Sequence, residues 1–400
     1  MDTLFFILSL CLKVFTVYFA CVAVFGLGRR KAYPPGEKKT RFAVLAAARN
    51  EEAVIADMVH SVLHQDYPTH LRDVFVIPNN CTDFTEMAAC AAGAEIIHCT
   101  GAVRNKGEAL REAFSQLKDR GYDAFIVFDA DNIAAPDYLS RVDDAICAGA
   151  RVWKTRLKAA NPTSSGVSGC YGLYNTCFDL FWNRPRSICG LSAKLVGTGF
   201  GFTRAVLEKL GGWNTATIAE DAEFAVQCAR VGERVWWVPD AVSYDEEPTS
   251  FFLSLRQRKR WCSGVMQVAR RELGRLWNTS APQPMLRWDM TMFLLAPFAG
   301  AVSALLMIGS FLLELVQGEV QILLPALIWV GCYYIGSVML SAVLCLVGGY
   351  GLRNMGRAVA LFPIFMATWL PLQILSLCKD TKQWSPIVHK GHGAVAGYRM

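Results

Sequence analysis

Two aspartates separated by one alanine, Asp129 and Asp131, directly follow a short apolar run in the first half of the chain. Two carboxylates at this spacing, at the end of a strand, can converge on one hard cation. Mg²⁺ and Mn²⁺ prefer oxygen ligands and usually share them with the phosphates of a substrate. Most such triplets are solvated loops in which an aspartate caps a helix, but the position after a buried strand favours a metal site here.

A second acidic pair, Glu220 and Asp221, precedes an amphipathic segment. Acidic residues are stabilised at helix N-termini by the helix dipole, so the pair can also be purely structural. A hydroxyl becomes a useful nucleophile when a carboxylate removes its proton. The chemical interpretation is therefore that Asp221 is a general base, with Glu220 beside it.

A dense basic and aromatic cluster follows at Gln257, Arg258, Arg260 and Trp261. One interpretation is binding of lipid headgroups at a membrane surface. The more specific interpretation is that Arg258 and Arg260 bind a diphosphate leaving group, because guanidinium groups suit bidentate phosphate contacts. Trp261 would then form the floor of a sugar site.

An alternation of strands and helices positions these residues. Strands are predicted at Phe42–Ala47, Val74–Ile77, Glu95–His98 and Phe125–Phe128, and helices at Asn50–Gln65, Thr85–Gly93 and Gly107–Asp119. This alternation predicts a parallel sheet with helices on both faces, whose ligands bind at the carboxyl ends of the strands. Polar clusters lie at those ends, at 49–51, 79–83 and 129–131. The sequence contains no G-x-G-x-x-G and no P-loop, which argues against dinucleotide or ATP binding.

The composition indicates a membrane protein. Of the 400 residues, 53% are hydrophobic and only 18% are charged, against about 25% charged in a typical soluble domain. The net charge of +6 points to a cytoplasmic membrane face and not to nucleic acid. The 14 cysteines include no C-x-x-C pair, so we interpret them as reduced thiols.

The first apolar run, Leu4–Phe25, contains a single charge at Lys13 and is long enough to span a bilayer. Arg29, Arg30 and Lys31 follow it without a small-residue cleavage site. This pattern favours an uncleaved anchor with its C-terminal end in the cytoplasm over a signal peptide.

Three uncharged apolar runs near the other end, Met290–Leu313, Val320–Val347 and Ala358–Cys378, are candidate spans. The first connector carries Glu314 and Glu319, which places it outside, and the second carries Arg353 and Arg357, which places it inside. The last run is ambiguous. If it spans fully, the basic tail with Lys379, Lys382, Lys390 and Arg399 ends outside, whereas Pro363 and Pro371 can break the run into an interfacial or re-entrant element.

In their order along the chain, the D-x-D, the E-D and the Q-x-x-R-W (Gln257, Arg260, Trp261) resemble the motifs of membrane-integrated, inverting family-two glycosyltransferases. These enzymes have a GT-A catalytic domain and include the cellulose, chitin, hyaluronan and poly-N-acetylglucosamine synthases. The resemblance covers roughly residues 41–261, the anchor and the trailing helices. It implies an α/β GT-A domain with a Rossmann-like mixed sheet, joined to an α-helical transmembrane region.

The resemblance also implies roles for single residues. Asp131 would ligate Mg²⁺ or Mn²⁺ on a UDP-sugar, with Asp129 near the metal or the ribose, and Lys106 near the nucleotide. Asp221 would be the base. The residues expected to contact substrates are Asn50, Glu52, Asn79, Asp83, Lys106, Asp129, Gly199, Gln257, Arg258, Arg260 and Trp261.

One residue departs from the family pattern. Asn79 stands where relatives commonly have a carboxylate that contacts the base, and an amide can still donate to and accept from a uracil edge. Asp83 either contributes to this site or belongs to a local turn. Gly199, in Gly197–Gly201, would let the backbone approach the terminal sugar of the acceptor.

The expected organisation is an anchor at 1–28, a cytoplasmic GT-A domain at 29–248, amphipathic interface helices at 249–288, transmembrane helices at 289–378 and a tail at 379–400. Aromatic and basic residues in Thr249–Trp277 and Tyr171–Trp182 predict interfacial helices, which either anchor the protein or guide a polysaccharide. The sequence does not indicate an oligomeric state.

Three functions remain open. The first is processive synthesis and export of a β-linked polysaccharide from UDP-glucose or UDP-N-acetylglucosamine, at the plasma membrane. The second is transfer of one sugar to a membrane lipid. The third, a transporter with a degenerate cytoplasmic domain, is disfavoured because the acidic motifs are intact and Lys13 is the one charge within the predicted spans.

Overall fold

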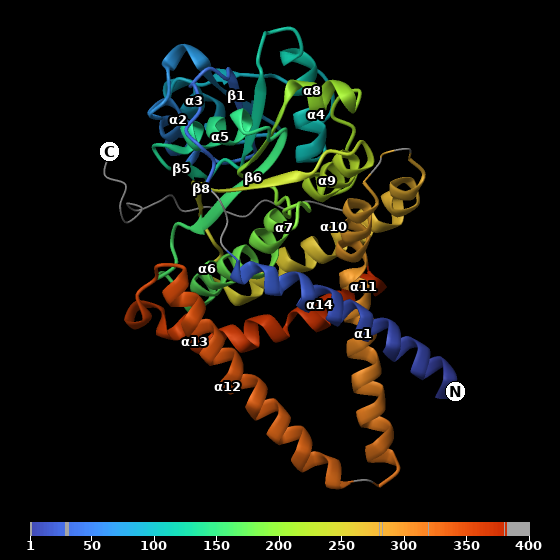
Figure 1. Ribbon diagram of the computed structural model, residues 1–400. Coiled ribbons are helices and arrows are strands. Elements are labelled where there is room, and N and C mark those ends of the chain that lie inside the picture. Colours follow the sequence, from blue (N-terminus) through green and yellow to red (C-terminus); the bar gives the residue numbers. More distant parts are fainter. Residues whose placement is uncertain are drawn as a thin grey trace.

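The computed structural model describes residues 2–28, 32–279, 281, 283–318, 320–379 and 381. It has two regions, a sheet domain flanked by helices and a group of long helices that extends away from it (Figure 1). The basic residues 29–31 and the tail residues Lys382, Lys390 and Arg399, which entered the topology argument, lie outside the described residues.

The sheet is mixed, in agreement with the predicted fold class. Its strands, in spatial order, are β3 (Glu95–Ile96), β2 (Arg72–Pro78), β1 (Phe42–Ala48), β4 (Ala124–Phe128), β7 (Phe200–Thr203), β6 (Val152–Ala159), β8 (Val235–Asp245) and β5 (Ile133–Ala134). The first four strands are mutually parallel, β7 runs antiparallel to β4 and β6, and β8 is parallel to β6. The four strands predicted from the sequence are therefore the parallel half of the sheet.

Apolar residues on both faces of each central strand explain why the sheet is covered on both sides. In β1, Ala43 and Leu45 point into one core and Phe42, Val44 and Ala46 into the other. The first core is covered by α4 (Lys106–Leu117), α8 (Arg204–Lys209) and α9 (Glu220–Arg230), and the second by α2 (Ile55–Leu63), α3 (Thr85–Ala91) and α5 (Tyr138–Cys147).

The helix after β1 begins later than predicted, at Ile55 and not at Asn50. Asn50 has a positive φ of 59°, so the chain turns there before the helix can start. The amides of Val54 and Ile55 then donate to the carbonyl of Glu51. This turn keeps residues 49–52 at the edge of the sheet.

The second region begins beneath the sheet domain. The segment α6 (Gly166–Phe178), a five-residue π-helix (Asp179–Asn183) and α7 (Arg184–Ile188) run continuously, and α10 (Phe251–Trp277) follows β8. Both predicted interfacial segments are thus helical. Figure 1 shows them between the sheet and the long helices.

Three helical stretches are long and apolar enough to cross a membrane: Pro284–Val316, Val320–Val347 and Leu352–Cys378. In Figure 1, α11 (Pro284–Val316) and α12 (Leu323–Val347) lie close together at their lower ends and separate towards the sheet domain. We call these two helices the arms. The third stretch is broken into α13 (Leu352–Ala367) and α14 (Trp369–Cys378), and the break at Thr368 falls three residues before Pro371. These two helices lie across the upper ends of the arms, against α6 and α10 (Figure 1). This arrangement matches the interfacial alternative for the last run.

The predicted N-terminal anchor is also a helix, α1 (Asp2–Val24), and it contacts α7 and α11. A buried polar cluster joins these three helices. Arg186 on α7 donates to both carboxylate oxygens of Asp289 on α11, at 3.0 and 2.9 Å, and the Tyr18 hydroxyl of α1 donates to the same carboxylate at 2.7 Å. The three helices are therefore held together where the sheet domain meets the apolar helices.

Candidate active site

The site is centred on Asp129, the first residue after β4. Lys106, the first residue of α4, forms an ion pair with Asp129 and donates to the carbonyl of Gly197 at 2.6 Å. Asn105 caps this helix by accepting from the amide of Glu108 at 3.0 Å, so the position of Lys106 is fixed by the start of α4. The structure thus brings together two predicted site residues that are 23 positions apart in the sequence.

Asp131 lies in an acidic group that the sequence analysis only partly found. It is 4% exposed, and the carboxyls of Asp245 and Glu247 lie close enough to interact with it. Burial and then the charge of Asp131 raise the pKa of Asp245 well above its ordinary value and that of Glu247 to about 8. Asn132 binds this group by donating to Asp245 at 2.9 Å.

The sequence analysis missed Asp245 and Glu247, although their position and spacing could have identified them. Asp245 is the last residue of β8 and Glu247 follows with one residue between them, a spacing like that of Asp129 and Asp131 after β4. The sheet order explains why both pairs meet: β8 pairs with the short strand β5, which directly follows the D-x-D.

The donor set suits Mg²⁺ or Mn²⁺. It offers hard carboxylate oxygens with an excess of negative charge, which a divalent cation would offset. Within the described part of the chain, no three Asp, Glu, His or Cys side chains are arranged as ligands of one ion. Asp131 and its neighbours would therefore supply part of the coordination shell, and diphosphate oxygens the remainder.

Glu220 and Asp221 form the first turn of α9 and face the same space. Gly107 permits this approach, because a Cβ there would lie 2.8 Å from Thr215 Oγ1 and 3.3 Å from Glu220 Cβ. Burial raises the pKa of Glu220 to about 7, against the opposing charge of Lys106. Burial likewise raises the pKa of Asp221, and its own helix amide and the charges of Lys106, Lys194 and Arg260 oppose that rise.

The Q-x-x-R-W residues lie on α10 and face α6 and α14. Gln257 accepts a hydrogen bond from the Tyr171 hydroxyl at 2.9 Å. Trp261 packs edge-on to Tyr171, with ring centroids 6.0 Å apart, and is stacked on Trp369 of α14 at 6.3 Å. Together with the charge of Arg260 on Asp221, these contacts place the motif beside the acidic pair.

The prediction that Arg258 faces the diphosphate is wrong for this conformation. Its side chain has no exposed surface, donates to the carbonyl of Phe365 on α13 at 2.8 Å and to Ser254 Oγ at 3.2 Å, and stacks on the Phe365 ring. Successive residues of a helix are rotated by about 100°, so Arg258 and Arg260 point to roughly opposite sides of α10. Arg258 fastens α13 to α10.

The loops after β1 and β2 are tied together. Asn50 accepts from the amide of Thr82 at 2.8 Å, and the carboxylate of Glu52 accepts from the amide of Phe84 at 2.9 Å. Asp83 accepts from both the amide and the hydroxyl of Thr85, which is the turn role considered as the alternative in the sequence analysis. These residues shape the loop pair at the carboxyl edge of the sheet.

Asn79 is 8% exposed, and both atoms of its amide have partners within the protein. Arg49 donates to its Oδ1 at 3.0 and 2.6 Å, and its Nδ2 donates to the carbonyl of Ala48 at 3.1 Å. The expected base contact through Asn79 therefore has to compete with Arg49, which the sequence analysis did not include among the site residues.

Gly199 does not lie at an acceptor surface as predicted. It is buried with a φ of 59°, and a Cβ there would lie 2.9 Å from both Thr155 Oγ1 and Ser243 Oγ. Its carbonyl accepts from Thr155, so this glycine is required for close packing on β6. Gly197 takes the place at the site, where its carbonyl binds Lys106.

The mixed sheet and the converging acidic motifs define a GT-A-type transferase domain joined to apolar helices. Residues 40–264, more than half of the chain, match the family described as Glycosyltransferase like family 2, and the chain belongs to that family.

Two curated relatives are similar over the same region. A probable glycosyltransferase YdaM of Bacillus subtilis (strain 168) is 27% identical over 250 residues, which are 60% of this chain and 58% of that protein. A beta-monoglucosyldiacylglycerol synthase of Synechocystis sp. (strain ATCC 27184 / PCC 6803 / Kazusa) is 28% identical over 301 residues, or 70% of this chain and 59% of that protein. The match thus spans less than two thirds of either relative.

One solved structure shares the fold over nearly the whole chain. The mannosyltransferase PcManGT from Pyrobaculum calidifontis, in complex with GDP-Man and Mn²⁺, superposes with a TM-score of 0.62 at 20% identity. The superposition covers 92% of this chain and 97% of that one, so the likeness includes helices outside the sheet domain.

Proposed function

We propose that this protein transfers one sugar, with inversion of the anomeric configuration, from a nucleoside-diphosphate sugar to a hydroxyl of a membrane lipid. The observation that carries the proposal is that α9, which bears the acidic pair, packs against α10 and α11, and that α10 in turn packs against α14. A lipid acceptor whose hydroxyl lies in the headgroup region of the cytoplasmic leaflet would reach this site without leaving the membrane.

The chain's own residues suggest a simple mechanism. Asp221 removes the proton of the acceptor hydroxyl as its oxygen attacks the anomeric carbon, and the bond from that carbon to the diphosphate breaks. Lys106 and Arg260 lie close to Asp221 and provide positive charge on the donor side. Mg²⁺ or Mn²⁺, held through Asp131 with Asp129, Asp245 and Glu247 near it, would neutralise the diphosphate that leaves.

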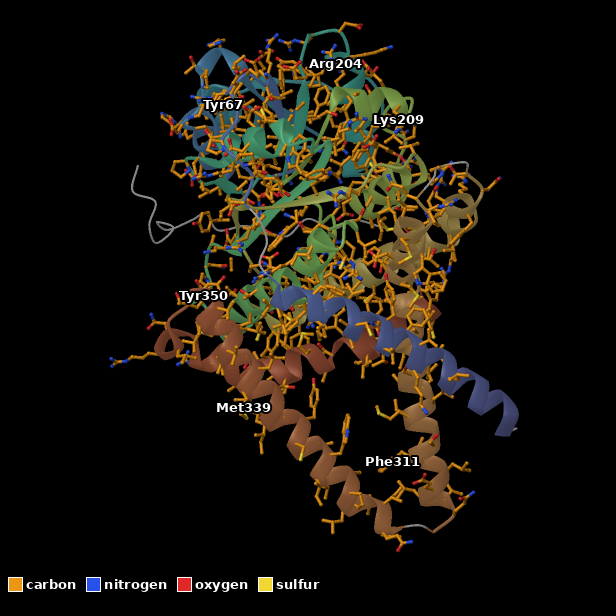
Figure 2. All side chains as sticks on the ribbon, in the orientation of Figure 1. Tyr67, Arg204, Lys209, Phe311, Met339 and Tyr350 are labelled. Carbon is orange, nitrogen blue, oxygen red and sulfur yellow. The ribbon has the colours of Figure 1, made fainter. Side chains whose placement is uncertain are left out.

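The arrangement of the apolar helices favours a lipid over a growing polysaccharide. The arms α11 and α12 diverge, and Phe311 and Met339 lie well apart on them (Figure 2). Next to Trp261, Trp369 and Tyr174 are stacked with ring centroids 5.6 Å apart and fill the space towards the membrane.

Processive polysaccharide synthesis is the second candidate. The contacts of Gln257 and Trp261 on α10 with Tyr171 of α6 favour it, because aromatic rings suit successive sugars of a chain. This function would require a path that additional helices complete.

The proposed location is a plasma membrane, in several passes, with the sheet domain in the cytoplasm. The charges support this orientation, because Arg353 and Arg357 follow α12 on the side of the sheet domain, whereas Glu314 lies near the far end of α11. UDP is the proposed nucleotide, although Asn79 stands where the family pattern has a carboxylate and its amide oxygen accepts from Arg49.

Membranes that contain the protein should be incubated with radiolabelled UDP- and GDP-sugars, and the products separated by thin-layer chromatography and by gel. A single labelled lipid, absent with Asp221→Asn, supports the proposed function. A ladder or long polymer that resists lipid extraction would refute it in favour of the second candidate.

A further inference from the structure

Lys194 is a cation near the base for which neither the motifs nor the mechanism has a role. It lies in the segment 191–195 that precedes β7, and its amide donates to Asn183 Oδ1 at 3.0 Å. Asn183, at the end of the π-helix, donates to Asp179 at 3.0 Å. These bonds fix the backbone of Lys194 on the helices beneath the sheet.

The side chain of Lys194 lies in largely apolar surroundings. Its ammonium is 4.3 Å from the centroid of the Phe178 ring. It lines a small cavity of about 10 Å³ together with Ala222 and Ala225 of the catalytic helix α9 and Asp289, Met290 and Phe293 of α11. Ala222 directly follows Asp221, so the lysine and the base lie next to the same cavity, and their charges interact.

Four cations interact with Asp221, and three of them have other partners or roles. Lys154 on β6 donates to the carbonyls of Thr155 and Gly199 at 2.8 and 3.4 Å. Lys106 on α4 is bound to Asp129 and to Gly197, and Arg260 on α10 is assigned to the diphosphate side. Glu220 on α9 adds a negative charge next to Asp221. Within the described residues, Lys194 has no ion pair and no side-chain hydrogen bond, and the charge of Asp221 is the leading interaction that keeps it protonated.

We propose that Lys194 is a positioning residue that keeps the Asp221 carboxylate ionised and ready to accept the acceptor's proton. The inference rests on the proposed function, because it takes Asp221 to be the base. Asp221 is partly buried and therefore poorly solvated, and a cation nearby favours its charged form. Burial also lowers the pKa of Lys194 itself to about 8, so the lysine is charged at neutral pH.

The pH profile of turnover tests this role. Lys194→Met removes the cation, so the pKa of Asp221 rises and the acidic limb of kcat/KM moves to higher pH, by roughly one unit. Well below the limb, activity falls about tenfold relative to the wild type, whereas well above it the two proteins converge. Lys194→Arg keeps the charge and should restore the wild-type limb.

The experiment uses the full-length protein in detergent with a UDP-sugar and extracted membrane lipid. It follows release of the nucleoside diphosphate from about pH 5 to about pH 9. Lys209→Met is the matched control, because Lys209 lies on the outer face of the sheet domain (Figure 2) and pairs with Glu233. Binding of UDP by each variant shows that it is folded, and Lys194→Gln replaces Lys194→Met if the latter does not bind.

A shifted limb in the Met or Gln variant, restored by arginine, supports the inference. If kcat/KM falls by the same factor at every pH and the acidic limb does not move, the inference is overturned and Lys194 is a packing residue. Asp221→Asn tests the assignment of the base separately from the role of Lys194. If that variant is inactive while the acidic limb of Lys194→Met does not move, the inference about Lys194 fails and the proposed base stands.

Discussion

Replacement of Asp221 by asparagine tests the mechanism with little change in shape. Asparagine retains the carbonyl oxygen that accepts from the amide of Ala222 at 2.7 Å, so the first turn of α9 keeps its hydrogen bond. What the substitution removes is the basic oxygen and the negative charge between Lys106, Lys194 and Arg260.

The two consequences differ in size. Loss of a general base reduces turnover by roughly 10²–10⁴-fold, which corresponds to about 3–5 kcal/mol in the activation free energy. Loss of a carboxylate at a helix N-terminus costs only about 0.3–1 kcal/mol of stability. Turnover should therefore collapse while thermal unfolding and UDP binding change little.

The assay measures release of the nucleoside diphosphate and formation of labelled product, and UDP affinity is determined in parallel. Asp119→Asn, an exposed aspartate at the end of α4, is the control and should behave like the wild type. Normal turnover of purified Asp221→Asn would refute the assignment of the base. Equal losses of UDP affinity and turnover would show that Asp221 serves donor binding instead.

Three further predictions follow from contacts in the structure. EDTA should stop turnover and Mn²⁺ or Mg²⁺ should restore it, and metal-independent turnover would contradict this. Asp245→Asn should raise the Mn²⁺ concentration for half-maximal activity by about tenfold, because losing a carboxylate that neighbours a metal ligand typically weakens metal affinity by that factor or more. Arg258→Met should lower the melting temperature by removing the bond to Phe365 but leave KM for the donor unchanged, whereas an increased KM with unchanged stability would return Arg258 to the phosphate site. Asp289→Asn leaves the buried Arg186 without its counter-charge and should destabilise the protein by about 3–5 kcal/mol in detergent, and an unchanged melting temperature would show that this cluster contributes little.

The pH dependence has a definite sign. Because burial raises the pKa of Asp221 above that of an exposed aspartate, the base becomes protonated at a higher pH than usual. The acidic limb of kcat/KM should therefore lie above the ordinary aspartate pKa of about 4. A limb at or below that value in the wild type would contradict the observed burial.

Local patterns were sufficient to predict the elements of the sheet domain and much of the site. Short apolar runs identified the four parallel strands, three of which (β1, β2 and β4) are largely buried, and polar residues after those three marked the edge where Asp129 and Asp131 lie. Long uncharged runs identified the apolar helices in the same way, because hydropathy depends only on residue type and length.

Directions and long-range neighbours were decided only by the tertiary structure. The rotation of α10 directs Arg258 into the helices and leaves Arg260 near Asp221, although the two are separated by a single residue. Pairing of β8 with β5 brings Asp245 to the D-x-D, and packing on β6 requires Gly199, which leaves Gly197 at the site. Sequence specifies which groups are available and their local conformation, whereas the sheet order and the angles between helices, set by packing over the whole chain, determine which groups meet.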